Sequence, residues 1–303
     1  MEVDASLTGR SIEHITSPEG FQFTVSVVRR SMTMFPTRER LRWLSSGRAG
    51  RRCAGYLPAM VAVLFALLNT LAATPACAAT FHAVIVGQTS DPSIGASVNA
   101  DVGMAIDFAN GVGQHFDDSD IKVLTGREAT AARVRATISR LDIGLDDFLL
   151  IYYSGHGDTS RREGSPWPWL AIGMEGFDLL MEANKLVTPR KLIVFDACNG
   201  SQEMPARRRP ASGSDFQPAQ VARLIKSLKG DVVVTSSKAP FVSYADSNGR
   251  GSRFSVEFFS TLVDEFSSSV SVNGWSEILR STRSRVENLG HNKQTPYFAF
   301  TTN

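Results

Sequence analysis

Short runs of consecutive apolar residues alternate with segments of helical periodicity from residue 80 to the end of the chain. A continuous apolar run between turn residues is typical of a strand that is buried on both faces, and apolar residues that recur at helical spacing are typical of an amphipathic helix. Strands that alternate with helices favour an open, largely parallel sheet with helices on both faces, so the predicted fold class is α/β. The pattern predicts strands at 81–86, 121–124, 148–153, 191–195, 231–235 and 296–300, and helices at 100–115, 128–141, 221–228, 254–266 and 275–289.

Two of these predicted strands lead directly into residues that can perform nucleophilic chemistry. His156 follows the strand at 148–153, and Cys198 follows the strand at 191–195. Functional sites of open α/β sheets lie beyond the carboxyl ends of the strands, and neighbouring strands are only about 4.8 Å apart. If the two strands are neighbours, Cys198 can attack a substrate carbonyl while His156 holds or donates the proton that the leaving amine needs. The backbone N–H groups of Gly157 and Cys198 are then the expected oxyanion-hole donors.

Each of these two residues also has a purely structural interpretation. A histidine after a strand is often an ordinary loop residue, and a single cysteine is often a buried and unreactive one. Of the three cysteines, Cys53 and Cys77 precede the predicted fold, so Cys198 would be the only thiol in it and could form no disulfide there. Catalysis is favoured because both residues follow long buried strands and each stands beside a glycine or a carboxylate.

Two motifs make a family resemblance specific. The segment Tyr152-Tyr153-Ser154-Gly155-His156-Gly157 resembles the histidine motif of the caspase, metacaspase and paracaspase superfamily, and Asp196-Ala197-Cys198 with Gly200 resembles its cysteine motif. Gln294-Thr295-Pro296 is similar to the start of the closing strand in bacterial members. The resemblance covers 80–303 and implies a caspase-type three-layer sandwich, with a mostly parallel six-stranded sheet, and a cysteine endopeptidase activity. One departure is that Asn199-Gly200 stands where metacaspases usually have His-Ser-Gly.

The resemblance also implies a substrate pocket. Asp196 resembles the acidic wall of the metacaspase pocket that receives the residue before the cut, Asp101 resembles its second acid, and Ser154 aligns with a serine that lines it. Two carboxylates in a cleft favour an Arg or Lys side chain through charge-assisted hydrogen bonds. The metacaspase Asn-Asp pair is split here by Ala100. The alternative is that Asp101 caps a helix and Asp196 orders a turn.

A basic triplet follows the cysteine motif. Arg207, Arg208 and Arg209 lie in a polar loop between 201 and 217. An enzyme that prefers basic residues could cleave itself there. The alternative is a solvated basic loop without a role in activation.

The N-terminal part of the chain differs in composition from the rest. Arginines concentrate before the first long apolar run, and 1–55 is predicted to be a basic leader. This leader is either disordered or the result of a start codon placed too early, in which case the initiator is Met32, Met34 or Met60.

The apolar segment at 56–79 predicts membrane targeting. It carries no charged residue and ends in small residues, with Ala76-Cys77-Ala78 or Cys77-Ala78-Ala79 as a cleavage site. A charged region, a short apolar stretch and such a site are the layout of a secretory signal, and an uncleaved membrane anchor is the alternative. We therefore expect the domain at 80–303 to be exported, either periplasmic or secreted, or else anchored to the membrane by 56–79.

Charge and motif content narrow the remaining function classes. The net charge of +2 offers no electrostatic basis for nucleic-acid binding, so the expected partners are protein or peptide substrates. No glycine-rich phosphate-binding motif follows the first strand. No cofactor or metal is predicted, because the histidines lack ligand spacing and no acidic cluster supports the calcium dependence of some metacaspases. The main alternative to an enzyme is an inactive caspase fold used as a binding or signalling module.

Overall fold

The chain divides into two compact units, Met1–Ala73 and Thr74–Asn303, in the computed structural model. The structure describes residues 12–16, 22–26, 78–160, 162, 164–172, 176–188, 190–200, 217–245, 248–267, 274–290 and 294–301. In the first unit these are two strands, β1 (Ile12–Thr16) and β2 (Gln22–Ser26), which pair antiparallel. The predicted targeting segment lies outside the described residues up to residue 77. None of the described helices combines the length and the apolar character that a membrane crossing requires.

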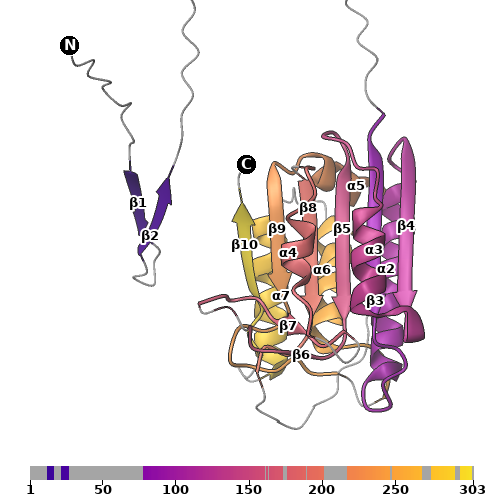
Figure 1. Ribbon diagram of the computed structural model, residues 1–303, viewed down its shortest axis with the longest axis vertical. Coiled ribbons are helices and arrows are strands. Elements are labelled where there is room, and N and C mark those ends of the chain that lie inside the picture. Colours follow the sequence, from indigo (N-terminus) through magenta and orange to yellow (C-terminus); the bar gives the residue numbers. More distant parts are fainter. Residues whose placement is uncertain are drawn as a thin grey trace, which may run out of the picture. The chain divides into compact units, whose positions relative to one another are not determined.

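The second unit is built on a six-stranded sheet, as predicted (Figure 1). Its strand order is β10-β9-β8-β5-β3-β4, in which only β10 is antiparallel to its neighbour. The predicted pair of strands that precede His156 and Cys198, β5 and β8, are direct neighbours. The strands are β3 (Thr80–Gly87), β4 (Asp118–Thr125), β5 (Phe148–Ser154), β8 (Arg190–Asp196), β9 (Gly230–Thr235) and β10 (Tyr297–Thr301).

Helices cover both faces of this sheet, which confirms the three-layer α/β architecture. Alternate residues of each strand serve the two faces: Phe81 and Ile85 of β3 pack on one side, and Val84 packs on the other. Burying each such large apolar side chain contributes roughly 1.5–3 kcal/mol to folding. The first face packs against α2 (Gly95–Gly113), α5 (Pro218–Lys226), α6 (Arg253–Ser267) and α7 (Trp275–Gly290), and the second packs against α3 (Ala131–Ser139) and α4 (Leu179–Ala183).

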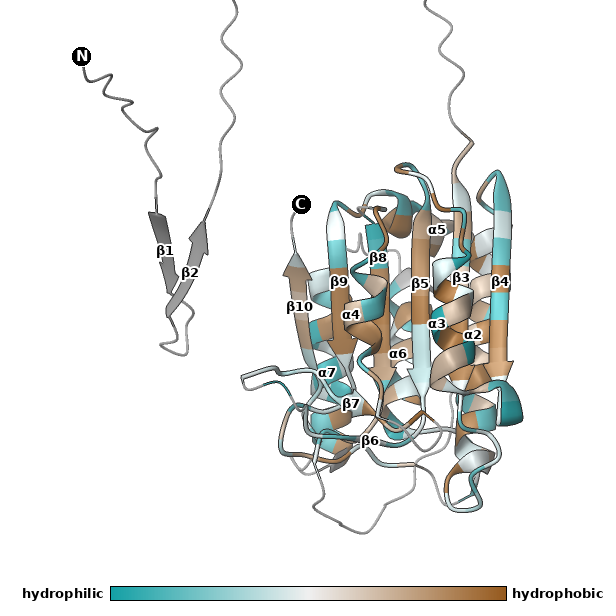
Figure 2. Cartoon of the chain, viewed as in Figure 1, coloured by the Kyte–Doolittle hydropathy of each residue, from teal (hydrophilic) through white to brown (hydrophobic). Residues whose placement is uncertain are grey.

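The hydropathy of the strands explains why the sequence pattern predicts them. Figure 2 shows the inner strands largely apolar along their middle, whereas the edge strand β4 alternates between apolar and polar residues. All seven residues of β5 are buried. A strand that is covered on both faces must be apolar at consecutive positions, so its sequence pattern is continuous rather than alternating.

Several element bounds differ from the sequence prediction. Helix α2 begins at Gly95 rather than near Ala100, because small residues without clear periodicity form its first turn. The strands β6 (Gly157–Asp158) and β7 (Trp169–Leu170), the helix α4 and the 3-10 turn Gly126–Glu128 were not predicted. Each is too short to produce a recognisable hydrophobic period.

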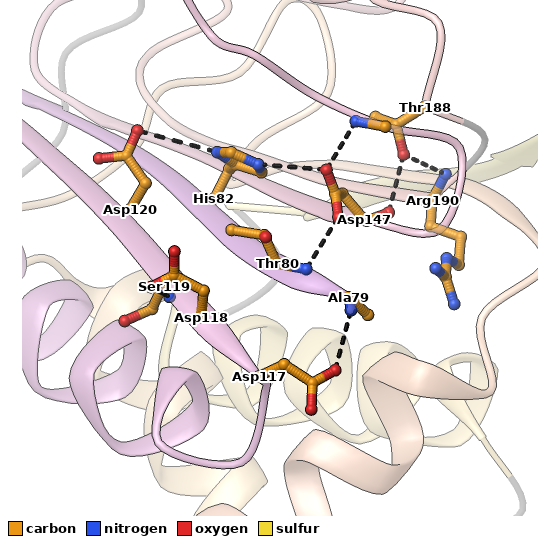
Figure 3. A network of polar contacts seen from close by, with 11 residues as sticks. Ala79, Thr80, His82, Asp117, Asp118, Ser119, Asp120, Asp147, Thr188 and Arg190 are labelled. Carbon is orange, nitrogen blue, oxygen red and sulfur yellow. Dashed lines mark hydrogen bonds and ion pairs between the residues drawn. The ribbon is translucent and has the colours of Figure 1, made fainter. Parts of the chain in front are cut away.

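Polar contacts hold the first residues of β3, at the amino ends of the parallel strands and opposite the candidate site (Figure 3). The backbone N–H of Ala79 donates to Asp117 over 2.9 Å, and that of Thr80 donates to Asp147 over 2.8 Å. His82 places its Nε2 3.4 Å from the same Asp147 carboxylate. The first strand of the domain is therefore held by side chains from the segments that precede β4 and β5.

Candidate active site

His156 and Cys198 line the same pocket at the carboxyl ends of β5 and β8. The register pairs Ser154 with Asp196, so each candidate residue stands two positions beyond a paired strand end. The pocket has a volume of about 120 Å³. Its wall contains His156, Cys198, Asp101, Asp196 and Ser154 together with residues of α2 and of the loop that follows β9.

The backbone of His156 is fixed on both sides. Its N–H donates to Oε1 of Gln88 over 2.5 Å, and its carbonyl accepts from the Tyr153 hydroxyl over 2.7 Å and from the Ala171 N–H over 3.0 Å. The Gln88 side-chain amide in turn donates to the Ala171 carbonyl. The ring remains half exposed and places Nε2 3.2 Å from a carboxylate oxygen of Asp91.

The Cys198 side chain is partly buried against the loop after β9. Its Sγ lies 3.4 Å from the Ser243 N–H nitrogen, which donates to it, and 3.6 Å from the Ser243 carbonyl oxygen. Burial raises the pKa of this thiol, and the carboxylates of Asp196 and Asp158 add to the rise, while the Ser243 N–H opposes it. In the free protein Cys198 is therefore a thiol at neutral pH, and a nucleophilic role would require a base to take its proton.

The backbone at Gly157 lies directly against Cys198. A Cβ atom at position 157 would be 2.6 Å from the Cys198 carbonyl oxygen and 2.8 Å from the Cβ of Ala197. Such distances are shorter than real side chains allow, so this close approach of the two backbones requires glycine. Among the residues that the structure describes, the Cys198 N–H has no hydrogen-bond acceptor.

Two buried carboxylates form the floor of the pocket. Asp101 is fully buried; its carboxylate accepts a 2.7 Å hydrogen bond from the Ser154 hydroxyl and another of 2.7 Å from the Ser252 N–H. Asp196 accepts from the hydroxyl groups of Ser243 (2.8 Å), Ser255 (2.5 Å) and Ser252, and from the Ser255 N–H (3.1 Å). The structure thus brings together all three residues predicted to form a substrate pocket.

The surroundings of Asp101 determine its protonation state. Burial, and then the nearby charge of Asp196, raise the pKa of Asp101 to about 8. Asp101 is therefore mostly protonated at neutral pH, and a bound cation would favour its ionisation. The alternative interpretation as a helix cap is wrong, because α2 begins at Gly95 and Asp101 lies inside the helix.

Asn199 and Gly200, which depart from the metacaspase motif, hold the loop that follows Cys198 in place. The buried Asn199 side chain donates to the Pro166 carbonyl over 2.8 Å, and its backbone N–H donates to the Phe241 carbonyl over 3.0 Å. A Cβ atom at Gly200 would be 1.9 Å from the Pro240 carbonyl oxygen. These contacts hold the loop after Cys198 against the loop after β9.

Sequence reasoning missed Gln88, Asp91 and Ser243, all of which lie in loops. Their only sequence signal is position: each follows a predicted strand, and the carboxyl ends of parallel strands converge. The predicted self-cleavage triplet Arg207, Arg208 and Arg209 lies outside the described residues. Within the described ranges, no group of three or more His, Cys, Asp or Glu side chains could hold a metal ion.

The fold and this site define a class of protein. A thiol and an imidazole beyond neighbouring parallel strands, over a floor of carboxylates, are the arrangement of an α/β cysteine peptidase. The family model of the caspase domain matches residues 82–303, and the chain belongs to this family. No curated protein matches the chain significantly.

Proposed function

We propose that the protein is an active cysteine endopeptidase that uses Cys198 and His156 and cleaves after Arg or Lys. One observation carries this proposal: Cys198, His156, Asp101 and Asp196 all line one pocket at the carboxyl edge of the sheet. The first two groups can perform acyl transfer, and the other two can receive a cationic side chain at the position before the cut.

The proposed reaction has two stages. His156 takes the proton of the Cys198 thiol as Sγ bonds to the substrate carbonyl carbon, and it then passes that proton to the leaving amine as the C–N bond breaks. A water molecule then attacks the acyl carbon while His156 takes one of its protons, and the C–S bond breaks as that proton passes to Sγ, which releases the acid product and restores the thiol. The N–H groups of Gly157 and Cys198 stabilise the oxyanion, and the contact between these two backbones supports this assignment.

The pocket chemistry supports a basic specificity. A guanidinium or ammonium group that enters the pocket can form charge-assisted hydrogen bonds with Asp196, and it favours ionisation of Asp101. An acidic side chain would be repelled by the charge of Asp196 and would not favour ionisation of Asp101. Each carboxylate is held by serine hydroxyl groups and backbone N–H groups, so the acceptors are oriented before the substrate binds.

A peptide panel that varies only the residue before the cut tests the proposal. The purified full chain is expected to turn over Arg and Lys peptides, and Cys198→Ala and His156→Ala are each expected to abolish turnover. Asp107→Asn, on an exposed position of α2 outside the pocket, is the control substitution and should turn over the same peptides as the unchanged chain. If no peptide is cleaved, the alternative of an inactive binding module is favoured. If peptides with Asp before the cut are preferred, only the proposed specificity for Arg or Lys is refuted.

We also propose that the loop with Arg207, Arg208 and Arg209 is a self-cleavage site. The proposal rests on the basic specificity argued above. Mass spectrometry of the active chain should show cleavage in this loop, and the same loop should be intact in Cys198→Ala. An intact loop in both proteins would refute self-cleavage.

A further inference from the structure

The loop after β3 lies beside the loop that carries His156. Strands β3 and β5 are parallel neighbours, and their register pairs Gly87 with Ser154. The Gln88 N–H extends this contact by donating to the Ser154 carbonyl over 3.1 Å. Asp91 and His156 therefore stand shortly beyond two paired strand ends, at the same edge of the sheet.

The Asp91 carboxylate is held in place by its own loop. Its Oδ1 accepts hydrogen bonds from the Ser93 N–H (2.8 Å), the Ser93 hydroxyl (2.5 Å) and the Ile94 N–H (3.2 Å). The backbone is fixed as well, because the Gly95 N–H donates to the Asp91 carbonyl over 2.8 Å. With Oδ1 engaged in this way, Oδ2 is the oxygen that faces His156, at 3.2 Å from Nε2.

The charge on Asp91 suits a partner of an imidazole. The Ser93 hydroxyl bond, the two backbone bonds and the neighbouring His156 lower the pKa of Asp91, and burial opposes them only in part. Asp91 is therefore ionised at neutral pH. A fixed anion on one ring nitrogen determines which nitrogen carries the proton and stabilises the imidazolium form.

We propose that Asp91 is a positioning residue for the peptidase reaction, acting through His156; this inference rests on the proposed function. Asp91 keeps the proton of the neutral ring on Nε2 and leaves Nδ1 free. Nδ1 then accepts the Cys198 proton and later donates it to the leaving amine, so the imidazole is neutral again after this step and Asp91 never takes the proton. The catalytic unit is a Cys-His-Asp set rather than a dyad.

Asp91→Asn tests this role with little change to the loop. The Asn oxygen can still accept from the Ser93 and Ile94 N–H groups, and the carboxylate oxygen that faces His156 is replaced by an NH₂ group, which carries no charge and cannot accept from Nε2. We expect kcat on the cleaved peptide to fall about 10- to 100-fold while KM changes less than about twofold. Loss of orientation without loss of binding is the signature of a positioning residue.

Asp178→Asn is the matched control. Asp178 has the same division of roles, since Oδ1 accepts from the Met181 N–H over 2.8 Å and Oδ2 lies 3.1 Å from Nε of Arg162. Neither Asp178 nor Asp91 lines the pocket itself, and the two differ in that the partner of Asp178 is Arg162 rather than His156. We expect this variant to retain the kcat of the unchanged protein, and an equal loss of kcat in both variants would overturn the proposal.

A spectroscopic measurement separates positioning from a structural effect. In the full chain with Cys198→Ala, the ¹⁵N shifts of the His156 ring should show the Nε2–H tautomer, and Asp91→Asn should shift the population toward Nδ1–H. An unchanged tautomer population overturns the proposal. If Asp91→Asn does not fold, Asp91→Ser takes its place under the same criteria, because a serine hydroxyl can accept the same backbone N–H groups.

Failure of the inference is distinguishable from failure of the proposed function. If Asp91→Asn keeps full kcat while His156→Ala and Cys198→Ala are inactive, the peptidase assignment stands and the role of Asp91 is refuted. If His156→Ala and Cys198→Ala retain turnover, the peptidase assignment itself is refuted.

Discussion

The buried Asp101 carboxyl group should make the stability of the domain depend on pH, and Asp101→Asn isolates this effect. In the folded protein, Asp101 accepts from the Ser252 N–H and from the Ser154 hydroxyl. An asparagine oxygen can keep the first bond, and its NH₂ group can donate to the Ser154 hydroxyl oxygen. The substitution therefore retains the contacts and removes the ionisation.

The sign of the effect follows from the raised pKa. Burial and the charge of Asp196 raise the Asp101 pKa from 3.8 to about 8, so the folded state holds a proton that the unfolded state releases. Below pH 3.8 both states are protonated and there is no cost. Between these two values the free energy of unfolding falls by about 1.4 kcal/mol per pH unit, which reaches roughly 5 kcal/mol by pH 8. Above pH 8 the cost is constant.

Urea denaturation of the full chain between pH 5 and about pH 9 measures this slope. The Cys198→Ala background removes the titration of the thiol and excludes the proposed self-cleavage. We expect the stability advantage of Asp101→Asn over the unchanged carboxyl group to grow with pH up to about 8 and then level off.

Asp147→Asn provides a control of opposite sign. Burial would raise the Asp147 pKa, but hydrogen bonds from the Gly144 and Thr80 N–H groups and the contact with His82 outweigh it, so the pKa is lowered. Its contribution to stability is present above the unfolded pKa and is lost as the pH falls through the folded pKa. Asp147→Asn should therefore show no advantage that grows from pH 5 to about pH 8. If the free energy of unfolding of Asp101→Asn and of the unchanged protein depended on pH in the same way, a raised pKa of Asp101 in the folded state would be refuted.

Three further predictions concern the site and the core. Gly157→Ala should lower kcat by about 10²- to 10³-fold, because its Cβ would push against the Cys198 carbonyl, and an unchanged kcat would contradict the oxyanion assignment. Alkylation of Cys198 by iodoacetamide in the free protein should still accelerate at pH 9, because burial raises the thiol pKa, and a plateau below about pH 8 would contradict this. Phe258→Ala, at a fully buried position of α6, should lower the free energy of unfolding by about 3–5 kcal/mol, and a loss below about 1 kcal/mol in urea denaturation would show that the core there is not closely packed.

Much of the fold could be predicted because burial leaves a periodic signature. The run at 148–153 indicated a strand covered on both faces, and β5 is buried throughout. The elements that the sequence did not predict, such as β6, β7 and α4, are too short to show a hydrophobic periodicity. Their stability comes from neighbours that are distant in the sequence.

The residues of the candidate site also divide into those that the sequence predicts and those that only the structure reveals. His156 and Cys198 could be proposed from sequence because each follows a strong strand. Asp91 could not, because nothing in its local sequence indicates that its carboxylate faces an imidazole beyond another strand. Only the parallel pairing of β3 with β5 brings these two loops together.

The sequence alone thus determined the α/β class, the alternation of strands and helices, and the residue types available for chemistry at the strand ends. The tertiary structure decided that β5 and β8 are neighbours, that two carboxylates share one pocket floor, and that one of them keeps its proton to about pH 8. The physical reason is that burial patterns are local and repeat along the chain. Strand order, register and the electrostatic coupling of side chains instead depend on contacts between segments far apart in the sequence.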